Sequence, residues 1–291
     1  RETSKEKSEY GKSLAALHIS VMLFGLSAVL GRFVDVPAVL VAAGRVVFSS
    51  LLLLVILLVK RAPLKLAASK DYAVALLAGA VLAVHWTTFF QSIQSASVAI
   101  GTITFSTFPL FLTFLEPLVF HEKLRLRDLL SAAVLLVGVI ITVPEFSMEN
   151  EMTISMIWGM VSSLSYAVLS LFNRYLAAKY EAKTICLYEQ GTAAVVLLPA
   201  WFLVAAEWSV SNVLGVAAIG LVCTAFAHSL YVSAQKKVKA QTAGIVSGME
   251  TVYGIAYALL LLGEVPTVRE IVGGALILGT ALFSSYKPKD K

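Results

Sequence analysis

The chain has 291 residues, of which 58% are hydrophobic and 14% are charged, and its formal net charge is +5 at pH 7. Roughly a quarter of the residues of an ordinary soluble domain are charged, so this composition excludes a typical water-soluble protein. The Lys and Arg residues stand in short segments between apolar runs, and such a distribution gives no indication of nucleic-acid binding.

Apolar runs of about 18 to 23 residues, the length that crosses a bilayer, follow one another along the chain. Their continuity excludes a β-barrel, whose strands alternate and need only about 10 residues. We therefore predict an all-α membrane protein with ten transmembrane helices. The expected helices cover residues 14–34, 38–59, 71–90, 96–119, 127–143, 154–174, 184–206, 211–233, 240–262 and 268–286.

Basic residues between the runs predict the orientation, because cytoplasmic loops carry an excess of Lys and Arg. If all ten runs cross the membrane, six basic groups fall on one side, and the opposite connections are short and partly acidic, with Arg32 and Arg269 as exceptions. We expect a multi-pass protein of the cytoplasmic (inner) membrane with both termini in the cytoplasm. The six groups begin at Arg1, Lys60, Lys123, Arg174, Lys236 and Lys287.

The two halves of the chain resemble each other at a spacing of about 142 residues. Pro109 and Glu122 are 13 residues apart, as are Thr251 and Glu264. Because each half has five runs, an odd number, the second copy must be inverted in the membrane, as in many secondary transporters. The expected organisation is a cytoplasmic tail (1–13), a first five-helix repeat (14–143), an acidic extracytoplasmic linker (144–153), a second five-helix repeat (154–286) and a cytoplasmic tail (287–291).

Three segments carry a resemblance to a known family: FPLFLTFLEPLVFHEKL around the end of the fourth run, ETVYGIAYALLLLGE in the ninth and GGALILGT in the tenth. With them the chain resembles the drug/metabolite transporter superfamily, in particular its EamA-type carriers with ten helices, over residues 14–286. Thr251 departs from the pattern, because a proline commonly stands there. The resemblance implies export or exchange of small metabolites, often amino acids, through a central cavity by alternating access.

Ionisable residues inside the apolar runs are candidate functional groups, because a charge in the bilayer costs at least a few kcal/mol. Arg45 stands about seven residues inside the second run. It could bind a substrate carboxylate, reach the headgroups or form a structural ion pair. Glu250 stands about ten residues inside the ninth run, and we predict that it couples transport to protons or binds a substrate amine, with a structural hydrogen-bond anchor as the alternative. Glu189, in the seventh run, is interpreted as structural or interfacial.

The segment HWTTFFQSIQ (85–94) places hydrogen-bonding groups at the end of the third run. A neutral imidazole and an indole would suit a zwitterion with an apolar side chain, so we predict that His85 and Trp86 line a cavity; for Trp86 the aromatic belt is the alternative. Tyrosines in the second half either line the same cavity or serve in packing. The predicted substrate-binding residues are His85, Trp86, Thr88, Arg45, Tyr166, Glu250 and Tyr253.

Small residues allow helices to approach closely in a membrane. GTITFSTF (101–108) and the pair Gly244 and Gly248 occupy corresponding places in the two halves. We therefore predict that the fourth and ninth helices cross near the centre. Ordinary packing is the alternative role of the glycines.

An enzyme is not predicted, because the sequence contains no H-E-x-x-H, no G-x-S-x-G and no Walker loop. We expect no cofactor and no metal. The expected partners are a small-molecule substrate and the lipid bilayer, and a homodimer is a further prediction. A carrier of organic cations, drugs or nucleoside-like solutes is the alternative, as is a channel, although no ring of charged residues is evident.

Overall fold

The computed structural model describes residues 4–121, 123–235 and 240–285. Within these ranges all regular structure is helical and no strand is present. The prediction of an all-α protein is therefore confirmed for the described residues. Some positions used above lie outside them, namely Arg1, Glu122, Lys236 and the predicted tail 287–291.

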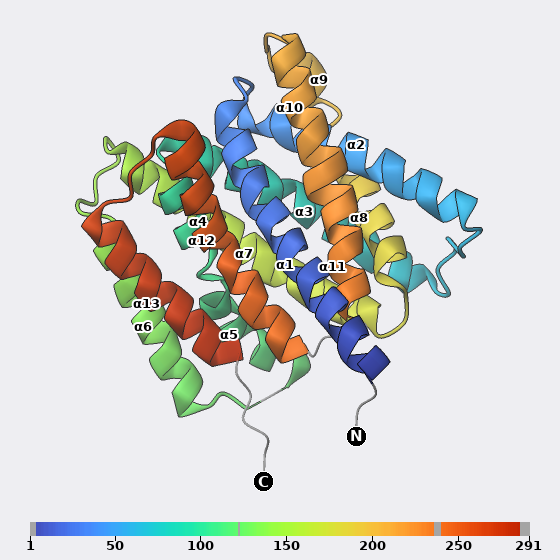
Figure 1. The fold of residues 1–291 in the computed structure, drawn as a ribbon, viewed down its shortest axis with the longest axis horizontal. Coiled ribbons are helices and arrows are strands. Elements are labelled where there is room, and N and C mark those ends of the chain that lie inside the picture. Colours follow the sequence, from blue (N-terminus) through green and yellow to red (C-terminus); the bar gives the residue numbers. More distant parts are fainter. Residues whose placement is uncertain (1–3, 122, 236–239, 286–291) are drawn as a thin grey trace.

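The helices lie side by side in a bundle, and α1 begins at the same edge at which α13 ends (Figure 1). Residues up to 143 form α1 (Ser4–Phe33), α2 (Ala38–Val59), α3 (Ser69–Ser95), α4 (Val98–Phe105), α5 (Phe108–Phe120) and α6 (Leu126–Thr142). The later residues form α7 (Glu151–Ala177), α8 (Ala182–Val196), α9 (Ala200–Leu203), α10 (Val210–Gly220), the π-helix η1 (Leu221–Phe226), α11 (Ala227–Gln235), α12 (Ala240–Leu262) and α13 (Val268–Ser285).

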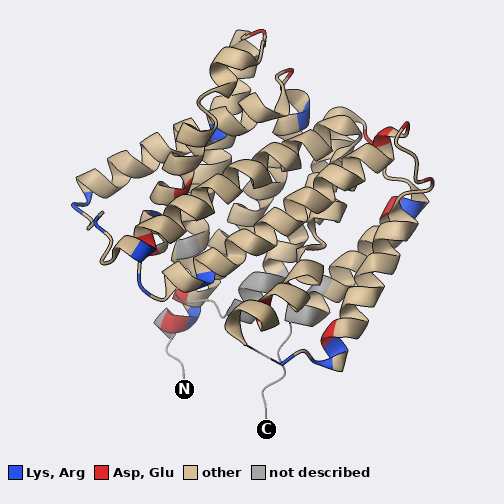
Figure 2. Cartoon of the chain, turned by 180° about the vertical axis from the view of Figure 1, so that it is seen from behind, with Lys and Arg blue, Asp and Glu red and all other residues tan. Residues whose placement is uncertain are grey.

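Seven helical stretches of the described chain are long and apolar enough to cross a membrane. The other expected helices coincide with α6, α12 and α13, which are outside this set. Charged residues gather at two opposite edges of the bundle, and the helices between these edges carry few (Figure 2). The seven stretches are Glu6–Phe33, Ala38–Val59, Ser69–Ser95, Val98–Phe120, Glu151–Ala177, Ala182–Leu203 and Val210–Tyr231.

The fourth expected helix is interrupted between α4 and α5. Pro109 stands in the first turn of α5, where a residue without an N–H is tolerated. The hydroxyl groups of Ser106 and Thr107 donate to backbone oxygens of α4, at 2.9 Å and 2.6 Å respectively. These hydroxyls bond carbonyl groups near the break, where the regular helical pattern ends.

The eighth expected helix contains the π-helix η1, a form that is rare and frequently found at functional sites. The hydroxyl of Thr224 donates to the carbonyl oxygen of Ile219 at 2.7 Å. A Cβ atom on Gly220 would lie only 2.7 Å from Cβ of Phe48 and 3.0 Å from the carbonyl oxygen of Arg45. The absence of a side chain at Gly220 therefore lets this irregular segment approach α2 closely.

Helices pack mainly against helices of the opposite half. In the first half, α1 contacts α11 and α12; in the second half, α7 contacts α3 and the α4–α5 pair. The first helix of each half thus packs on the third or fourth expected helix of the other half. Two further contacts, α2 with α8 and α6 with α13, join helices in corresponding places. This reciprocal pattern is typical of two copies related by a two-fold rotation.

The predicted crossing of the fourth and ninth helices is present, because α4 packs against α12. The hydroxyl groups of Ser106 and Thr251 are 2.8 Å apart at this crossing. Two of the glycines serve in other contacts, which is the alternative of ordinary packing: Gly101 packs against α3 and Gly248 against α13. Gly254 faces α4 instead, with 3.6 Å between its ideal Cβ position and the nearest atom.

Glycine allows α6 and α13 to touch, and its replacement tests that contact. A Cβ atom on Gly273 would lie 2.1 Å from Thr142 Oγ1 and 2.7 Å from the carbonyl oxygen of Gly138. Gly273→Ala is expected to lower the free energy of unfolding by about 1 to 3 kcal/mol, because the two backbones must separate. Thermal unfolding of the purified protein in detergent measures the effect. Gly279→Ala, on the same helix with nothing within 4 Å of its Cβ position, is the control, and equal losses in both variants would contradict the prediction.

Candidate functional site

Arg45 lies inside the bundle on α2, with 6% of its surface exposed. Its guanidinium carbon is 4.0 Å from the centre of the Trp86 ring, a favourable arrangement of a cation on an aromatic face. Its Nε donates to the hydroxyl of Thr224 in η1 at 2.7 Å. The side chain is thus held by α3 on one side and by the π-helix on the other.

The charge of Arg45 has no ion-pair partner within 4.0 Å among the residues that the structure describes. An unpaired buried charge is costly, and a structural ion pair was one of the alternatives expected from the sequence. The carboxyl group of Glu250 interacts with Arg45 electrostatically from beyond ion-pair distance. Arg45 therefore keeps the capacity to bind an anionic group.

Glu250 belongs to α12, which packs against α1, α4 and α13. Glu250 is partly exposed, although its helix packs against three others. It interacts electrostatically with Tyr166 on α7 and with Tyr231 on α11. A Cβ atom on Gly25 would lie 3.0 Å from the carbonyl oxygen of Glu250. This glycine lets α1 and α12 meet at the level of the carboxyl group.

His85 connects α3 to α7. Its Nδ1 is 2.9 Å from the carbonyl oxygen of Ser162 and 3.0 Å from the hydroxyl of the same residue. The imidazole centroid is 5.2 Å from the ring centroids of Phe105 and of Tyr166. With 5% of its surface exposed, His85 supports the aromatic groups beside the Arg45 and Glu250 region.

The structure brings together some of the predicted site residues and separates others. Arg45, Trp86, Tyr166 and Glu250 share one interior region. By contrast, the hydroxyl of Thr88 donates within its own helix, to Val84 at 2.8 Å. The hydroxyl of Tyr253 lies 3.4 Å from Nδ1 of His18 on α1.

Thr224 is part of the site and was missed by the sequence reasoning. It stands in the apolar segment LVCTAF, and nothing in this pattern marks a π-helix. A single hydroxyl in an apolar run is common, because a threonine can donate to a backbone carbonyl of its own helix. The contact with Arg45 joins residues 179 positions apart, which local sequence patterns do not reveal.

The end of the bundle near the α12–α13 connection is held by one polar network. Arg32 on α1 forms an ion pair with Glu264, with 3.0 Å between Nε and Oε1, and Nη1 donates to the carbonyl oxygen of Gln94 at 2.7 Å. The second carboxylate oxygen of Glu264 accepts from the backbone N–H of Val98 at 2.9 Å. Three separate parts of the chain are thus joined at this end.

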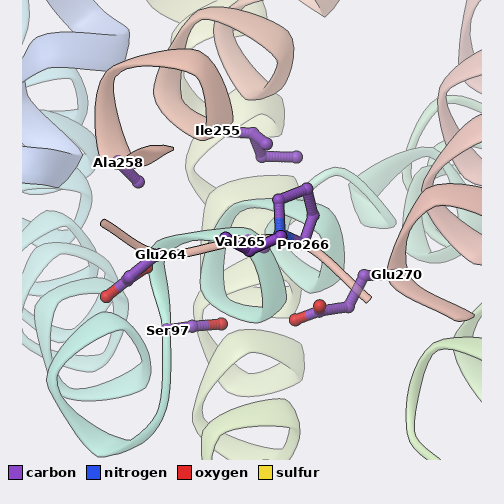
Figure 3. Close-up of a pocket in the computed structure, with 8 residues that line it drawn as sticks. Ser97, Ile255, Ala258, Glu264, Val265, Pro266 and Glu270 are labelled. Atoms are coloured by element: carbon purple, nitrogen blue, oxygen red, sulfur yellow. The ribbon is translucent and has the colours of Figure 1, made fainter. Parts of the chain in front are cut away.

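A small hollow lies beside this network (Figure 3). The Ser97 hydroxyl and the Glu270 carboxylate point towards each other across it. Its volume is about 20 Å³, which is room for about one water molecule. The hollow is therefore too small for a metabolite. Its lining consists of Ser97, Ala99, Ile255, Ala258, Glu264, Val265, Pro266 and Glu270.

A second polar cluster joins the start of α3 to the end of α7. Asp71, which is 1% exposed, accepts hydrogen bonds from Tyr175 at 2.9 Å, from Lys179 at 3.1 Å and from Tyr180. The hydrogen bonds of Lys179 with Tyr175 and with Asp71 raise the pKa of the lysine above its ordinary value. The hydrogen bond to Asp71 likewise raises the pKa of Tyr180. Both groups therefore keep their protons at neutral pH and maintain the cluster.

A sequence profile of the EamA-like transporter family matches residues 12–143 and, a second time, residues 153–286. The chain belongs to the EamA-like transporter family. The resemblance predicted from the sequence is confirmed, and this EamA-family chain is a membrane transporter by family.

Two relatives agree with this assignment, and one solved structure has a similar fold. An Archaeoglobus fulgidus protein named an uncharacterized transporter is 28% identical over 196 residues, which cover 67% of this chain and 70% of that protein. A Helicobacter pylori (strain J99) protein with the same name is 26% identical over 208 residues, 67% of each chain. A structure described only as "Crystal structure of protein" has a TM-score of 0.64 and 16% identity, covering 94% of this chain and 96% of that chain. This last likeness shows the fold alone.

Proposed function

We propose that this EamA-family chain is a secondary transporter that exports or exchanges small metabolites, foremost amino acids, across the cytoplasmic membrane by alternating access. Ten membrane helices form two inverted five-helix repeats around a central site, and both termini are cytoplasmic. The double match to the family profile supports two repeats, and so does the reciprocal packing of the halves. The start of α1 and the end of α13 at one edge support an even number of crossings (Figure 1).

The observation that carries the proposal is the buried guanidinium of Arg45, which has no ion-pair partner among the described residues and lies in the same interior region as the Glu250 carboxyl group. An amino acid carries one carboxylate and one ammonium group. A guanidinium binds a carboxylate through two parallel hydrogen bonds, so Arg45 takes the carboxylate of the substrate and Glu250 takes its ammonium group. Trp86 and Tyr166 contact the apolar side chain, since aromatic rings bury large surfaces and still offer a polar group.

The remaining predicted residues have supporting roles in this proposal. His85 positions the Tyr166 ring, which is 5.2 Å from the imidazole. Thr88 and Tyr253 stay predicted substrate-binding residues, although in this structure the hydroxyl of Thr88 donates within α3 and that of Tyr253 lies beside His18. Glu250 takes up a proton when the ammonium group leaves, because an unpaired carboxylate in the membrane interior is costly. The exported substrate is thereby exchanged for a proton at Glu250.

The network of Arg32 and Glu264 closes the outer end in the conformation described, and the cluster around Asp71 lies at the cytoplasmic end. Opening the outer end requires the ion pair of Arg32 and Glu264 to break. The homodimer stays a prediction.

Counterflow in proteoliposomes tests the proposal. Vesicles that contain the purified protein are loaded with one unlabelled amino acid at a time, and the entry of the labelled amino acid is followed. Saturable counterflow with at least one amino acid is expected. Counterflow only with organic cations or nucleosides would favour the alternative carrier, which needs Glu250 and the aromatic rings but not Arg45. Flux that rises linearly with concentration would indicate a pore.

A further inference from the structure

Glu189 on α8 is a buried carboxyl group with an unusual set of partners. Only 4% of its surface is exposed, and the side-chain amide of Asn173 on α7 hydrogen-bonds to it. Its Oε1 atom has no hydrogen-bond partner among the described residues. The Oδ1 atom of Asn173 is buried and has no partner either. Two residues that are already joined by one hydrogen bond thus leave two acceptor oxygens unsatisfied.

One proton accounts for both oxygens. A carboxylate can only accept hydrogen bonds, whereas a protonated carboxyl group has an O–H that donates. If Oε1 of Glu189 carries the proton, it can donate to Oδ1 of Asn173 while the Asn173 amide donates to the other carboxyl oxygen. The pair then has two complementary hydrogen bonds and no unpaired acceptor, as buried polar groups require.

Within the described chain, no cation forms an ion pair with Glu189. The titratable groups that interact with it are Cys186 on its own helix and Tyr166 on α7, and both are uncharged at neutral pH. On α11, Nε2 of His228 is 2.8 Å from Sγ of Cys186.

The helices α2 and α3 also pack against α8. The charged group of α2, Arg45, is held by Trp86 and Thr224 and forms no ion pair with Glu189. From α2, the hydroxyl of Ser49 donates to the side chain of Gln190. From α3, the backbone approaches closely at Gly79, where a Cβ atom would lie 2.7 Å from the carbonyl oxygen of Glu189. The carboxyl group is therefore enclosed by neutral partners, which favour its protonated form.

We propose that Glu189 and Asn173 form a proton-binding site, distinct from the substrate site of Arg45 and Glu250, which is loaded in the conformation described and releases its proton to water when the helices rearrange. This role in coupling rests on the transport function proposed above. The step is a simple ionisation: the O–H bond of Glu189 breaks, the electron pair stays on the carboxylate, and the proton passes to water on the side that has opened.

Infrared spectroscopy of the purified protein in liposomes tests the protonation directly. Wild type is expected to show the carbonyl stretching band of a buried protonated carboxylic acid at neutral pH. Because Glu250 is also proposed to hold a proton when no substrate is bound, Glu189→Gln should lose one part of the band and Glu250→Gln a different part. The part lost in Glu189→Gln should be shifted in frequency in Asn173→Ala, which removes the amide partner. A spectrum of Glu189→Gln that retains the whole band would overturn the proposal. Thermal unfolding of each variant confirms that it is folded.

Transport driven by a pH gradient tests the coupling. One coupled proton supports about tenfold accumulation for each pH unit, since a tenfold ratio of protons balances a tenfold ratio of substrate. Because Glu250 is proposed to exchange a proton of its own, Glu189→Gln is expected to lower the accumulation by about tenfold for each pH unit and to keep counterflow, which needs no net proton movement. Accumulation in Glu189→Gln equal to that of wild type would overturn the coupling role. If a sodium gradient at equal pH drives accumulation and Glu189→Gln loses it, the coupling ion at Glu189 is sodium, and the proposed proton site is wrong.

The failure of this inference and the failure of the proposed function give different results. If wild type shows no counterflow with any amino acid, the proposed substrate class is wrong. The infrared band still decides whether Glu189 holds a proton, because it requires no substrate.

Discussion

Arg45→Gln is expected to lower the affinity for the transported amino acid by about 100-fold, because truncating one partner of a buried, hydrogen-bonded charge pair typically costs about 2 to 5 kcal/mol. Glutamine keeps a side-chain amide near Thr224 but removes the positive charge and the two parallel donors that a carboxylate requires. The concentration of unlabelled amino acid that halves counterflow measures the affinity.

The selectivity of this loss distinguishes a binding role of Arg45 from a structural role. The amine that corresponds to the substrate without its carboxyl group has no carboxylate for Arg45 to bind. Wild type and Arg45→Gln should therefore bind this amine with equal affinity. Arg127→Gln is the matched control. It removes the same charge away from the proposed site, at the start of α6, where Arg127 contacts Phe283 of α13. If Arg45→Gln weakens the amino acid and the amine equally, or leaves both unchanged, Arg45 does not bind the carboxylate.

Glu250→Gln is expected to have the complementary effect. The affinity for the amino acid should fall by about 10- to 100-fold, since a hydrogen bond between charged groups contributes about 1.5 to 3 kcal/mol. The 2-oxo acid that corresponds to the substrate has no ammonium group, and it should bind wild type and Glu250→Gln equally well. Competition with labelled amino acid in the counterflow assay measures both affinities.

The control for Glu250 is Glu149→Gln, which removes a negative charge from an exposed position outside the helices. It is expected to leave both affinities unchanged. A loss of 2-oxo acid binding in Glu250→Gln would show that the carboxyl group acts on the structure of the site and not on the ammonium group.

Much of the helical pattern follows from simple features of the sequence. The second helix was expected at 38–59 and α2 has these bounds, because Pro37 and Lys60 flank an uninterrupted apolar run with one charge. The interruption at Ser106 and Thr107 was not predicted. A hydropathy pattern measures only the preference of side chains for lipid, and both hydroxyls satisfy backbone carbonyls at the break.

The candidate site could be predicted only where a residue is unusual by itself. Arg45 and Glu250 stand out because ionisable groups are rare in apolar runs, and the structure puts them in one interior region. For Thr88, also predicted to bind the substrate, the structure shows a hydroxyl that donates to Val84 one turn away. The pairing of Glu189 with Asn173 depends on how α7 meets α8 and on two unsatisfied oxygens, and neither is visible in a linear pattern.

The reciprocal packing of the two halves has a consequence for biogenesis. The faces of α1, α3 and α6 are covered mainly by α12, α7 and α13, which follow much later in the chain. During synthesis, the early helices therefore enter the bilayer before the helices that cover them have been made. Until then, their small and hydroxyl-bearing residues face lipid. Final assembly has to follow the synthesis of the last helix, so a truncated nascent product would be a substrate for membrane quality-control proteases.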